Sequence, residues 1–248
     1  MRNRDQLRFL LLEARLDPEM REHERSCLVR AGSLRPEQFT IHNVLEEAPS
    51  ERLLDGYDAV LIGGTGDYSV SSHRGEWFQP LVDFTNLLLD RNVPSLGLCY
   101  GFHLMAAAVG GRVERRPEEG ETGTHLVELT PEGQRDVLFE AIPSSFEAQQ
   151  GHHDVVMEVP GPYVRLAGSQ KCLWQALRHP DKPFYGLQFH PELSREDFML
   201  RMRKYRHVYA STPGLYEQID ASVKETRVQA VIHNFVERVV LATSPAGA

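Results

Sequence analysis

The cysteine at position 99 stands where covalent chemistry is usually done. It follows the apolar run 93–98, which predicts a short buried strand, and precedes 102–109, which predicts a helix. Gly97 and Gly101 allow a sharp strand-to-helix turn without a Cβ clash. A thiol at a helix start lies near the positive end of the helix dipole, which favours the thiolate. The alternative is that Cys99 is a small buried apolar residue, as many free cysteines are.

A second segment supplies a base and a carboxylate. Residues 184–189 predict another apolar strand, and His190-Pro191-Glu192 follows it. Side chains two residues apart on an extended segment point the same way. The imidazole can then take the thiol proton while Glu192 holds the ring. The alternative is a solvated loop in which Pro191 only ends a strand.

Together, two motifs resemble the class I glutamine amidotransferases, whose glutaminase domains carry a Cys-His-Glu triad. They are GLCYG at 97–101 and GLQFHPE at 186–192. The resemblance extends from about residue 8 to about residue 195 and is closest to the glutaminase part of GMP synthetases. It implies that Cys99 is the nucleophile, His190 the general base and acid, and Glu192 the residue that orients His190.

A glycine-rich loop, GGTGD at 63–67, follows the predicted strand 57–62. It lacks the Lys-Ser/Thr ending of a phosphate-binding P-loop. In the family this loop lies beside the nucleophile, so the resemblance implies that the backbone N–H groups of Gly64 and Tyr100 form the oxyanion hole. Loss of one such donor typically lowers the rate by about two to three orders of magnitude.

The chemistry that this resemblance implies is acyl transfer to sulfur. The Cys99 thiolate attacks the side-chain amide carbon of glutamine, and His190 protonates the departing ammonia. Water then hydrolyses the glutamyl thioester with His190 as the base. Neither a metal nor an organic cofactor is expected.

Position 103 departs from the family pattern. The resembling enzymes usually carry glutamine four residues after the cysteine, where its amide helps to hold the substrate, and this chain has His103. Histidine is shorter and offers different donors. It is either a tolerated pocket substitution or the sign of a changed substrate, such as a γ-glutamyl amide or peptide.

The stretch QGHHD at 150–154 resembles the segment with which GMP-synthetase-type glutaminases contact the amino-acid end of glutamine. The resemblance implies substrate contacts from His103, Gly151, His152 and Asp154, with Asp154 receiving the ammonium group. His153 stands where the family has glycine. Two histidines and an aspartate also suggest a metal site. Neighbouring side chains on an extended segment diverge, however, so substrate contact is favoured and no metal is predicted.

The composition agrees with a soluble enzyme, since 41% apolar residues in a chain of 248 suffice for a full core. Three cysteines give no paired disulfide framework, and the first residues lack a signal-peptide core. No apolar run reaches membrane-spanning length. We therefore expect a cytoplasmic protein with no membrane partner.

The net charge of −8 argues against nonspecific nucleic-acid binding, which usually needs a basic face. A basic cluster at 195–207 is interleaved with Glu196 and Asp197 on a predicted helix. We interpret it as a solvated helix face, with a docking surface for a partner protein as the alternative.

Predicted strands alternate with helices along the first half of the chain. Strands are expected at 8–13, 39–44 and 57–62, and helices at 18–31 and 77–90. This order predicts an α/β fold with a mostly parallel sheet flanked by helices, of the flavodoxin-like class I amidotransferase type, and an active site at the carboxyl ends of the strands. Residues 111–188 add short β-rich runs, expected as antiparallel edge strands.

After Glu192 the pattern becomes helical. We therefore expect a catalytic domain at 1–193 and a C-terminal helical extension at 194–248 packed on the same domain. The extension is too short for an ATP-dependent synthetase domain. An acceptor for glutamine-derived ammonia would then be activated by a separate synthetase partner.

Three hypotheses follow from the residues and the resemblance. The first is a glutaminase that releases ammonia from glutamine, alone or with a synthetase partner. The second is a hydrolase of γ-glutamyl peptides or conjugates, which His103 permits. The third is a binding or regulatory protein that has the pocket but catalyses nothing, although such a protein has no need of Cys99, His190 and Glu192 together.

Overall fold

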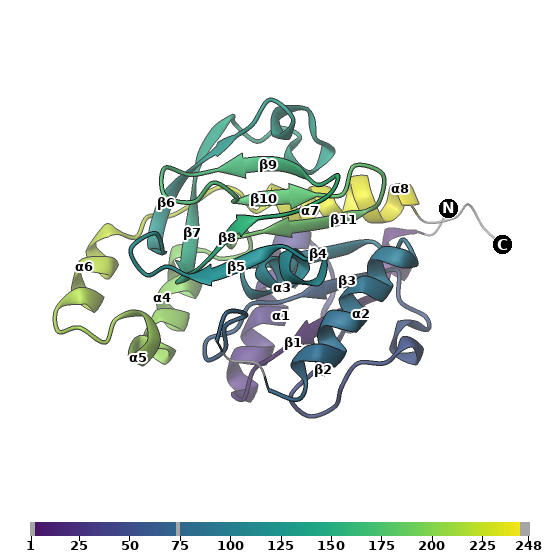
Figure 1. Cartoon of the computed structure of the whole chain (residues 1–248), viewed down its shortest axis with the longest axis horizontal. Coiled ribbons are helices and arrows are strands. Elements are labelled where there is room, and N and C mark those ends of the chain that lie inside the picture. Colours follow the sequence, from purple (N-terminus) through teal and green to yellow (C-terminus); the bar gives the residue numbers. More distant parts are fainter. Residues whose placement is uncertain (1–2, 73–74, 244–248) are drawn as a thin grey trace.

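The computed structural model describes residues 3–72 and 75–243, and its centre is a nine-stranded sheet in the order β2-β1-β3-β4-β11-β10-β9-β6-β7 (Figure 1). The first five strands in this order are parallel to one another. This arrangement confirms the predicted α/β fold with a mostly parallel sheet. The parallel strands are β1 (Phe9–Glu13), β2 (Phe39–Asn43), β3 (Ala59–Ile62), β4 (Ser95–Leu98) and β11 (Phe184–Leu187).

Antiparallel strands extend the sheet beyond β11, as expected for the β-rich segment. Two further strands lie outside this sheet and pair with each other in a small second sheet. Arg115 at the end of β5 is paired with Asp154 at the start of β8, and both residues line the pocket described below. The antiparallel strands are β6 (Glu121–Leu129), β7 (Ser145–His152), β9 (Val164–Gly168) and β10 (Ala176–Arg178), and the second sheet holds β5 (Arg112–Arg115) and β8 (Asp154–Glu158).

Helices cover both faces of the parallel strands. Along β1, Phe9 and Leu11 belong to the core under α1 and α7, whereas Leu10 and Leu12 belong to the core under α2 and α3. A strand buried on both faces is typical of parallel sheets. The bounds are α1 (Pro18–Gly32), α2 (Phe78–Asp90), α3 (Tyr100–Ala108) and α7 (Ala230–Asn234), with 3₁₀ turns at Arg4–Gln6, Pro36–Gln38, Glu51–Leu54, Gly133–Arg135 and Val137–Phe139.

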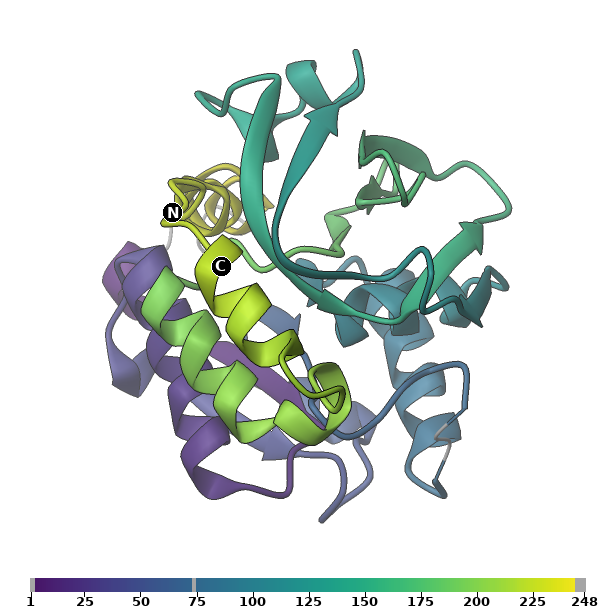
Figure 2. The same cartoon turned by 90° about the vertical axis from the view of Figure 1, so that its left-hand side faces the viewer.

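The C-terminal helices pack on the side of the sheet that carries α1. Figure 2 shows α1, α4 and α6 side by side, and Cys27, Phe198 and Ile219 meet in one apolar cluster between them. Four apolar residues at helical spacing lie in the main core: Ile232, Phe235, Val236 and Val239. The elements are α4 (Arg195–Lys204), α5 (Arg206–Tyr209), α6 (Leu215–Ser222), the π-helical turn Phe235–Val240 and α8 (Leu241–Thr243).

Two expectations about this region have different outcomes. The helical pattern expected after Glu192 is interrupted at Tyr205, which separates α4 from α5. The division into a catalytic domain at 1–193 and an extension at 194–248 stays a prediction. In the described part of the chain, we find no helix with both the length and the apolar character needed to cross a bilayer.

The turn between β4 and α3 is strained at Cys99, whose φ of 51° and ψ of −97° lie outside the regions that most residues adopt. Helix α3 begins at Tyr100, two residues earlier than expected. It can do so because Gly101 lies against β3: a Cβ at Gly101 would be 2.1 Å from the carbonyl oxygen of Ile62. The glycine therefore sets how closely the helix start approaches the sheet.

Replacing Gly101 with alanine should destabilise the protein by about 3 kcal/mol or more, because the new methyl group overlaps backbone rather than a movable side chain. Gly214→Ala is the matched control. Gly214 has a φ of 82° but open space around it, so only the left-handed backbone penalty of about 1 to 2 kcal/mol applies. Urea unfolding of both variants measures the difference. Equal losses of unfolding free energy would contradict the packing argument.

Candidate active site

Two neighbouring parallel strands bring Cys99 and His190 to the same edge of the sheet. Leu98 of β4 is paired in register with Leu187 of β11, and the Cys99 N–H donates to the Leu187 carbonyl at 2.8 Å. His190 Nδ1 lies 2.8 Å from Glu192 Oε1, and both side chains are buried. The structure therefore brings together the three residues predicted to form the triad.

The segment that carries the histidine is less extended than expected. Strand β11 ends at Leu187, and His190 forms an isolated antiparallel bridge with Gln149 of β7. Glu192 lies in the turn that follows. The imidazole and the carboxylate meet through this turn rather than through the alternation of side chains along a strand.

The surroundings of His190 favour its charged form. Burial alone would lower the pKa of the ring, but Glu192 and the hydrogen bond to Cys99 raise it to about 9. Burial works to raise the pKa of Glu192, and His190 and Arg201 outweigh it, so the pKa lies below its usual value. An imidazolium beside a cysteine sulfur is the arrangement that stabilises a thiolate nucleophile.

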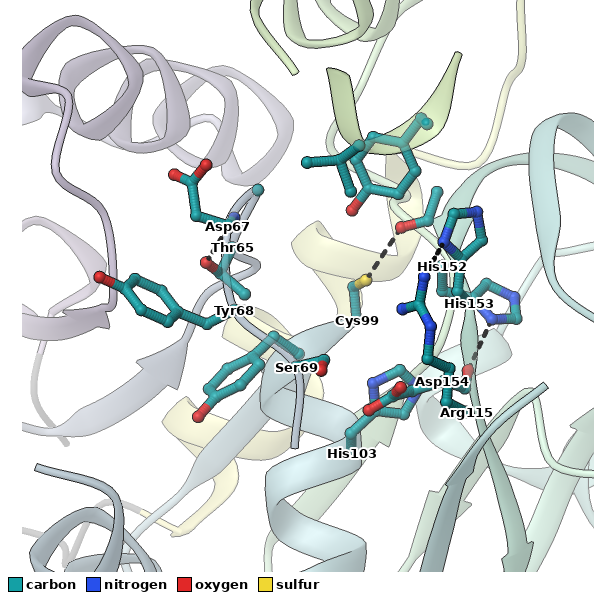
Figure 3. Close-up of a pocket in the computed structure, with 15 residues that line it drawn as sticks. Thr65, Asp67, Tyr68, Ser69, Cys99, His103, Arg115, His152, His153 and Asp154 are labelled. Atoms are coloured by element: carbon teal, nitrogen blue, oxygen red, sulfur yellow. Dashed lines mark hydrogen bonds between the residues drawn. The ribbon is translucent and has the colours of Figure 1, made fainter. Parts of the chain in front are cut away.

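A pocket opens in front of the cysteine (Figure 3). The Cys99 thiol donates to the Gly151 carbonyl at 3.6 Å. Asp154 is held by Ser71, whose N–H and hydroxyl donate to the two carboxylate oxygens at 2.9 and 2.6 Å. The sequence-predicted residues His103, Gly151, His152 and Asp154 all line this pocket. Their assignment as substrate contacts stays a prediction.

The His103 side chain is hydrogen-bonded to another side chain of the protein. Its Nε2 lies 2.6 Å from Gln188 Oε1, and the ring is buried. Burial lowers its pKa to about 4, with Asp154 opposing the shift. The ring is therefore neutral at physiological pH and shapes the pocket without adding charge to it.

Gly64 differs from the expectation for an oxyanion donor. Its N–H donates to Glu24 Oε1 at 2.9 Å, so this hydrogen bond points to helix α1 rather than to the nucleophile. Tyr100, the other expected donor, is the first residue of α3, where backbone N–H groups have no partner within the helix. The oxyanion assignment of Gly64 and Tyr100 stays a prediction.

Buried charges surround the triad on the α1 side. Glu24 accepts a hydrogen bond from Arg15 Nε at 2.7 Å, and Arg201 Nη1 donates to Glu192 Oε1 at 3.3 Å. Arg201 comes from the basic cluster at 195–207, which we predicted to be a solvated helix face. For Arg201 this prediction is wrong, because its side chain is 9% exposed and pairs with Glu192.

Two residues at the site carry no local sequence signal. Val208 and Tyr209 of α5 line the pocket, as does Arg115. The Tyr209 ring also packs against His153, with centroids 5.5 Å apart. Arg115, His152, His153 and Asp154 are grouped on the same side of Cys99 in Figure 3. Only the tertiary fold brings α5 and the paired residues Arg115 of β5 and Asp154 of β8 to Cys99.

His152 also lies among two other residues that can bind metals. Glu121, His152 and Cys172 place one ligating atom each within 4.8 Å of one another. These partners come from separate strands and connections, so sequence spacing gave no sign of them. Gln175 donates to Glu121 at 2.5 Å, and the Cys172 thiol donates to the Glu119 carbonyl at 3.2 Å. The cluster thus ties the 151–154 segment to the neighbouring β-strands.

Comparison with known proteins agrees with this geometry. The family model described as glutamine amidotransferase class-I matches residues 25–204. A solved glutamine amidotransferase from Thermotoga maritima superposes with a TM-score of 0.68 and 21% identity, covering 95% of this chain and 98% of that one. Another, from Methylobacillus flagellatus, gives a TM-score of 0.65 and 15% identity over 95% and 93%.

Curated proteins with similar sequences are named as glutamine-hydrolysing GMP synthases or their subunits. A glutamine-hydrolysing GMP synthase of Malacoplasma penetrans is 32% identical over 161 residues, which are 64% of this chain and 28% of that protein. In Methanopyrus kandleri, a protein named as one subunit of a glutamine-hydrolysing GMP synthase is 38% identical over 110 residues, 44% of this chain and 57% of that one. The chain thus corresponds to between about a quarter and somewhat over half of these relatives.

The charged histidine makes stability depend on pH. The folded-state pKa of His190 is about 9, above the usual 6.5. The stabilisation that the charged His190 ring gives to the folded protein is therefore fully present below pH 6.5 and is lost as pH rises through 9. Over this range the free energy of unfolding should fall by about 3 kcal/mol. Urea unfolding of His190→Gln against the unmutated protein at several pH values should show the difference shrink across this window. Cys99→Ala removes one of the contacts that raise the pKa of His190, so the dependence of the unfolding free energy on pH should be smaller in this variant. A difference that stays constant from pH 6 to 9.5 would contradict the charged His190.

Proposed function

Since this chain belongs to the class I glutamine amidotransferase family, we propose that it hydrolyses the side-chain amide of glutamine, or of a close γ-glutamyl relative, through a thioester on Cys99. The observation that carries this proposal is the alignment of Cys99, His190 and Glu192 at the carboxyl ends of adjacent strands. A strained backbone at the nucleophile and a buried His-Glu pair serve covalent catalysis and have no evident use in a protein that only binds a ligand.

In the proposed mechanism, the Cys99 thiolate attacks the amide carbon and forms a tetrahedral oxyanion. His190, charged at neutral pH, gives its proton to the leaving nitrogen, and ammonia departs. His190 is then neutral and can take a proton from water, which attacks the thioester and releases the carboxylic acid. Glu192 holds the ring and stabilises its charge in both steps.

The amino-acid end of the substrate would lie at the far side of the pocket from the sulfur. Asp154, oriented by Ser71, offers a carboxylate to an α-ammonium group. The Arg115 guanidinium, which lies 3.4 Å from His153 Nδ1, offers a cation to an α-carboxylate on the same side. This pairing supports a zwitterionic glutamyl group as the recognised part of the substrate.

We further propose that the released ammonia is used by a synthetase on a separate polypeptide. The support is that the Methanopyrus relative is named as one subunit of a glutamine-hydrolysing GMP synthase. Stimulation of glutamine hydrolysis by a candidate synthetase would support the pairing.

A second candidate function is hydrolysis of γ-glutamyl peptides or conjugates. The observation that favours it is His103, which occupies the position where the family has glutamine and is bonded to Gln188. A ring locked in this way cannot offer the amide contacts of the family residue. The pocket beside it can then differ in the leaving group that it accepts.

The primary test is ammonia release from glutamine by the purified chain, beside Cys99→Ala and a panel of γ-glutamyl compounds. We expect turnover that falls by at least about three orders of magnitude in Cys99→Ala, because the thioester cannot form. Cys27→Ala is the matched control, since burial raises the pKa of the Cys27 thiol to about 12 and leaves it unreactive. Equal turnover in Cys99→Ala and the unmutated protein would refute the proposal.

The substrate class is tested by His103→Gln, which restores the family residue. If His103 sets the preference, the ratio of kcat/KM for glutamine to that for a γ-glutamyl peptide should rise about tenfold, the size of effect that one or two hydrogen bonds give. Gln188→Met, which removes the partner of His103 without restoring the amide at 103, separates pocket shape from the amide contact. An unchanged ratio in His103→Gln would remove the γ-glutamyl peptide hypothesis.

A further inference from the structure

Three side chains of types that bind metals meet beside the pocket that His152 lines. Glu121 begins β6 and His152 ends β7, and the two residues are directly opposite each other in this antiparallel pair. Cys172 lies in the connection between β9 and β10. One ligating atom of each residue lies within 4.8 Å of the others, and all three residues are buried. The fold therefore brings a carboxylate, an imidazole and a thiol together from three separate segments.

The His152 ring is oriented as a metal ligand would be. Its Nδ1 lies 2.8 Å from the Asp154 carbonyl oxygen, and because a carbonyl can only accept, Nδ1 is the nitrogen that donates. The other nitrogen, Nε2, is buried, has no hydrogen-bond partner among the described residues and lies 3.6 Å from Glu121 Oε2. Metal-binding histidines are held in this way, with one nitrogen donating to a carbonyl and the other directed at the ion.

The Glu121 carboxylate is fixed by neutral donors. The Gln175 amide and the Ser169 hydroxyl donate to Oε2 at 2.5 and 3.2 Å, and Oε1 lies 3.7 Å from Nδ1 of the half-buried His125. A buried carboxylate needs a positive charge beside it, which neutral donors do not supply. The 3.6 Å between Glu121 Oε2 and His152 Nε2 is close to the separation of about 3.4 Å that two ligands have on a tetrahedral zinc ion.

Cys172 belongs to a connection that reaches the surface. Its neighbours Lys171 and Leu173 are exposed, whereas Cys172 is buried. The Ser169 N–H donates to the Cys172 carbonyl at 2.8 Å, and the Cys172 N–H donates to the Ser169 hydroxyl at 3.0 Å, so the connection forms a tight turn. Since the ligating atoms lie within 4.8 Å of one another, the sulfur needs to approach by no more than about 1.2 Å to bind zinc. An exposed turn can supply this movement and a path for the ion.

We propose that Glu121, His152 and Cys172 bind a zinc ion that holds the 151–154 segment to β6 and to the β9–β10 connection. Zinc accepts thiolate, imidazole and carboxylate ligands together, whereas magnesium and calcium prefer oxygen alone. The thiol proton is released to solvent when the sulfur binds as a thiolate. The fourth position of the ion is filled by water or by the second Glu121 oxygen. This inference does not rest on the proposed function.

A second group of the same residue types provides an internal comparison. Within the described ranges, His23, Cys27 and Asp197 also place ligating atoms within 4.8 Å of one another. Here, however, Arg30 donates to the Cys27 sulfur at 3.6 Å and also to the Asp197 carboxylate. A guanidinium thus supplies the positive charge that a metal ion would bring. We expect no zinc at this second group.

The test is the amount of zinc bound per chain, measured by elemental mass spectrometry after equilibrium dialysis at a series of free zinc concentrations. All chains carry Cys99→Ala, so that the nucleophile contributes no ligand. We expect one zinc per chain and a Kd at least about a hundredfold higher in Cys172→Ser, because loss of a ligand costs more than loss of an outer contact. Cys27→Ala is the matched control and should leave the Kd unchanged. A chain that binds no zinc, an unchanged Kd in Cys172→Ser, or a raised Kd in Cys27→Ala would overturn the proposal.

A cobalt spectrum of the Cys99→Ala chain keeps the inference falsifiable even if Cys172→Ser folds poorly. Tetrahedral Co²⁺ absorbs visible light strongly, and a bound thiolate adds a charge-transfer band. We expect both features, and we expect one equivalent of zinc to abolish them, because these ligands bind Zn²⁺ more tightly than Co²⁺. A cobalt spectrum without the thiolate band would show that Cys172 is not a ligand and would refute the site.

Discussion

The active site depends on the balance of charge around two buried carboxylates, Glu24 and Glu192. Both are almost inaccessible to solvent, and both are ionised only because Arg15, Arg201 and His190 lie beside them. Removing one partner from such a group leaves a buried charge uncompensated, which typically costs about 3 to 5 kcal/mol. Glu13, at the end of β1, shows the other outcome, since burial and the neighbouring Glu24 raise the pKa of this carboxyl far enough to keep it neutral at physiological pH. The arginines thus decide which acids carry charge, and through Glu192 they decide the charge on His190.

The central sheet fixes the positions of the residues that take part in this charge balance. β4 and β11 are adjacent and in register, so Cys99 and the segment that carries His190 leave the sheet at the same edge. β3 lies beside β4, with β1 on its other side, and the connection after β3 runs between Glu24 and His190. Because every parallel strand ends at this edge, one buried network can contact His190, Glu192 and the glycine loop at once. A displacement of α1 or α4 would therefore change the contacts of His190, Glu192 and the glycine loop together.

Much of this arrangement could be predicted from the sequence, and the reason is local. Apolar runs ending in Cys99 and His190 define the strands, and glycines at 97 and 101 mark a turn that only small residues allow. Helix α3 starts two residues before its predicted start, and the strand before His190 is shorter than predicted, because strand and helix ends depend on tertiary hydrogen bonds. The prediction for Arg201 is wrong because six basic residues close together look like a solvated face, and nothing in the local pattern marks the one that turns inward. The burial of Glu24 could not be predicted for a similar reason. The neighbouring residues on α1 are those of an exposed helix face, and only the tertiary fold places Arg15 and Gly64 against Glu24.

The C-terminal helices contribute to the pocket as well as to the charge balance. The match to the family model ends at residue 204, within α4. In this chain, Val208 and Tyr209 of α5 form part of the pocket wall beyond that point. Arg201 of α4 contacts Glu192, and Tyr205, which follows α4, packs against the glycine loop. Substrate entry and the charge on the triad are therefore linked through one short stretch of helix. Because α5 lines the pocket in front of Cys99 and α4 carries Arg201, a movement of these two helices would change access to the pocket and the charge on His190 together.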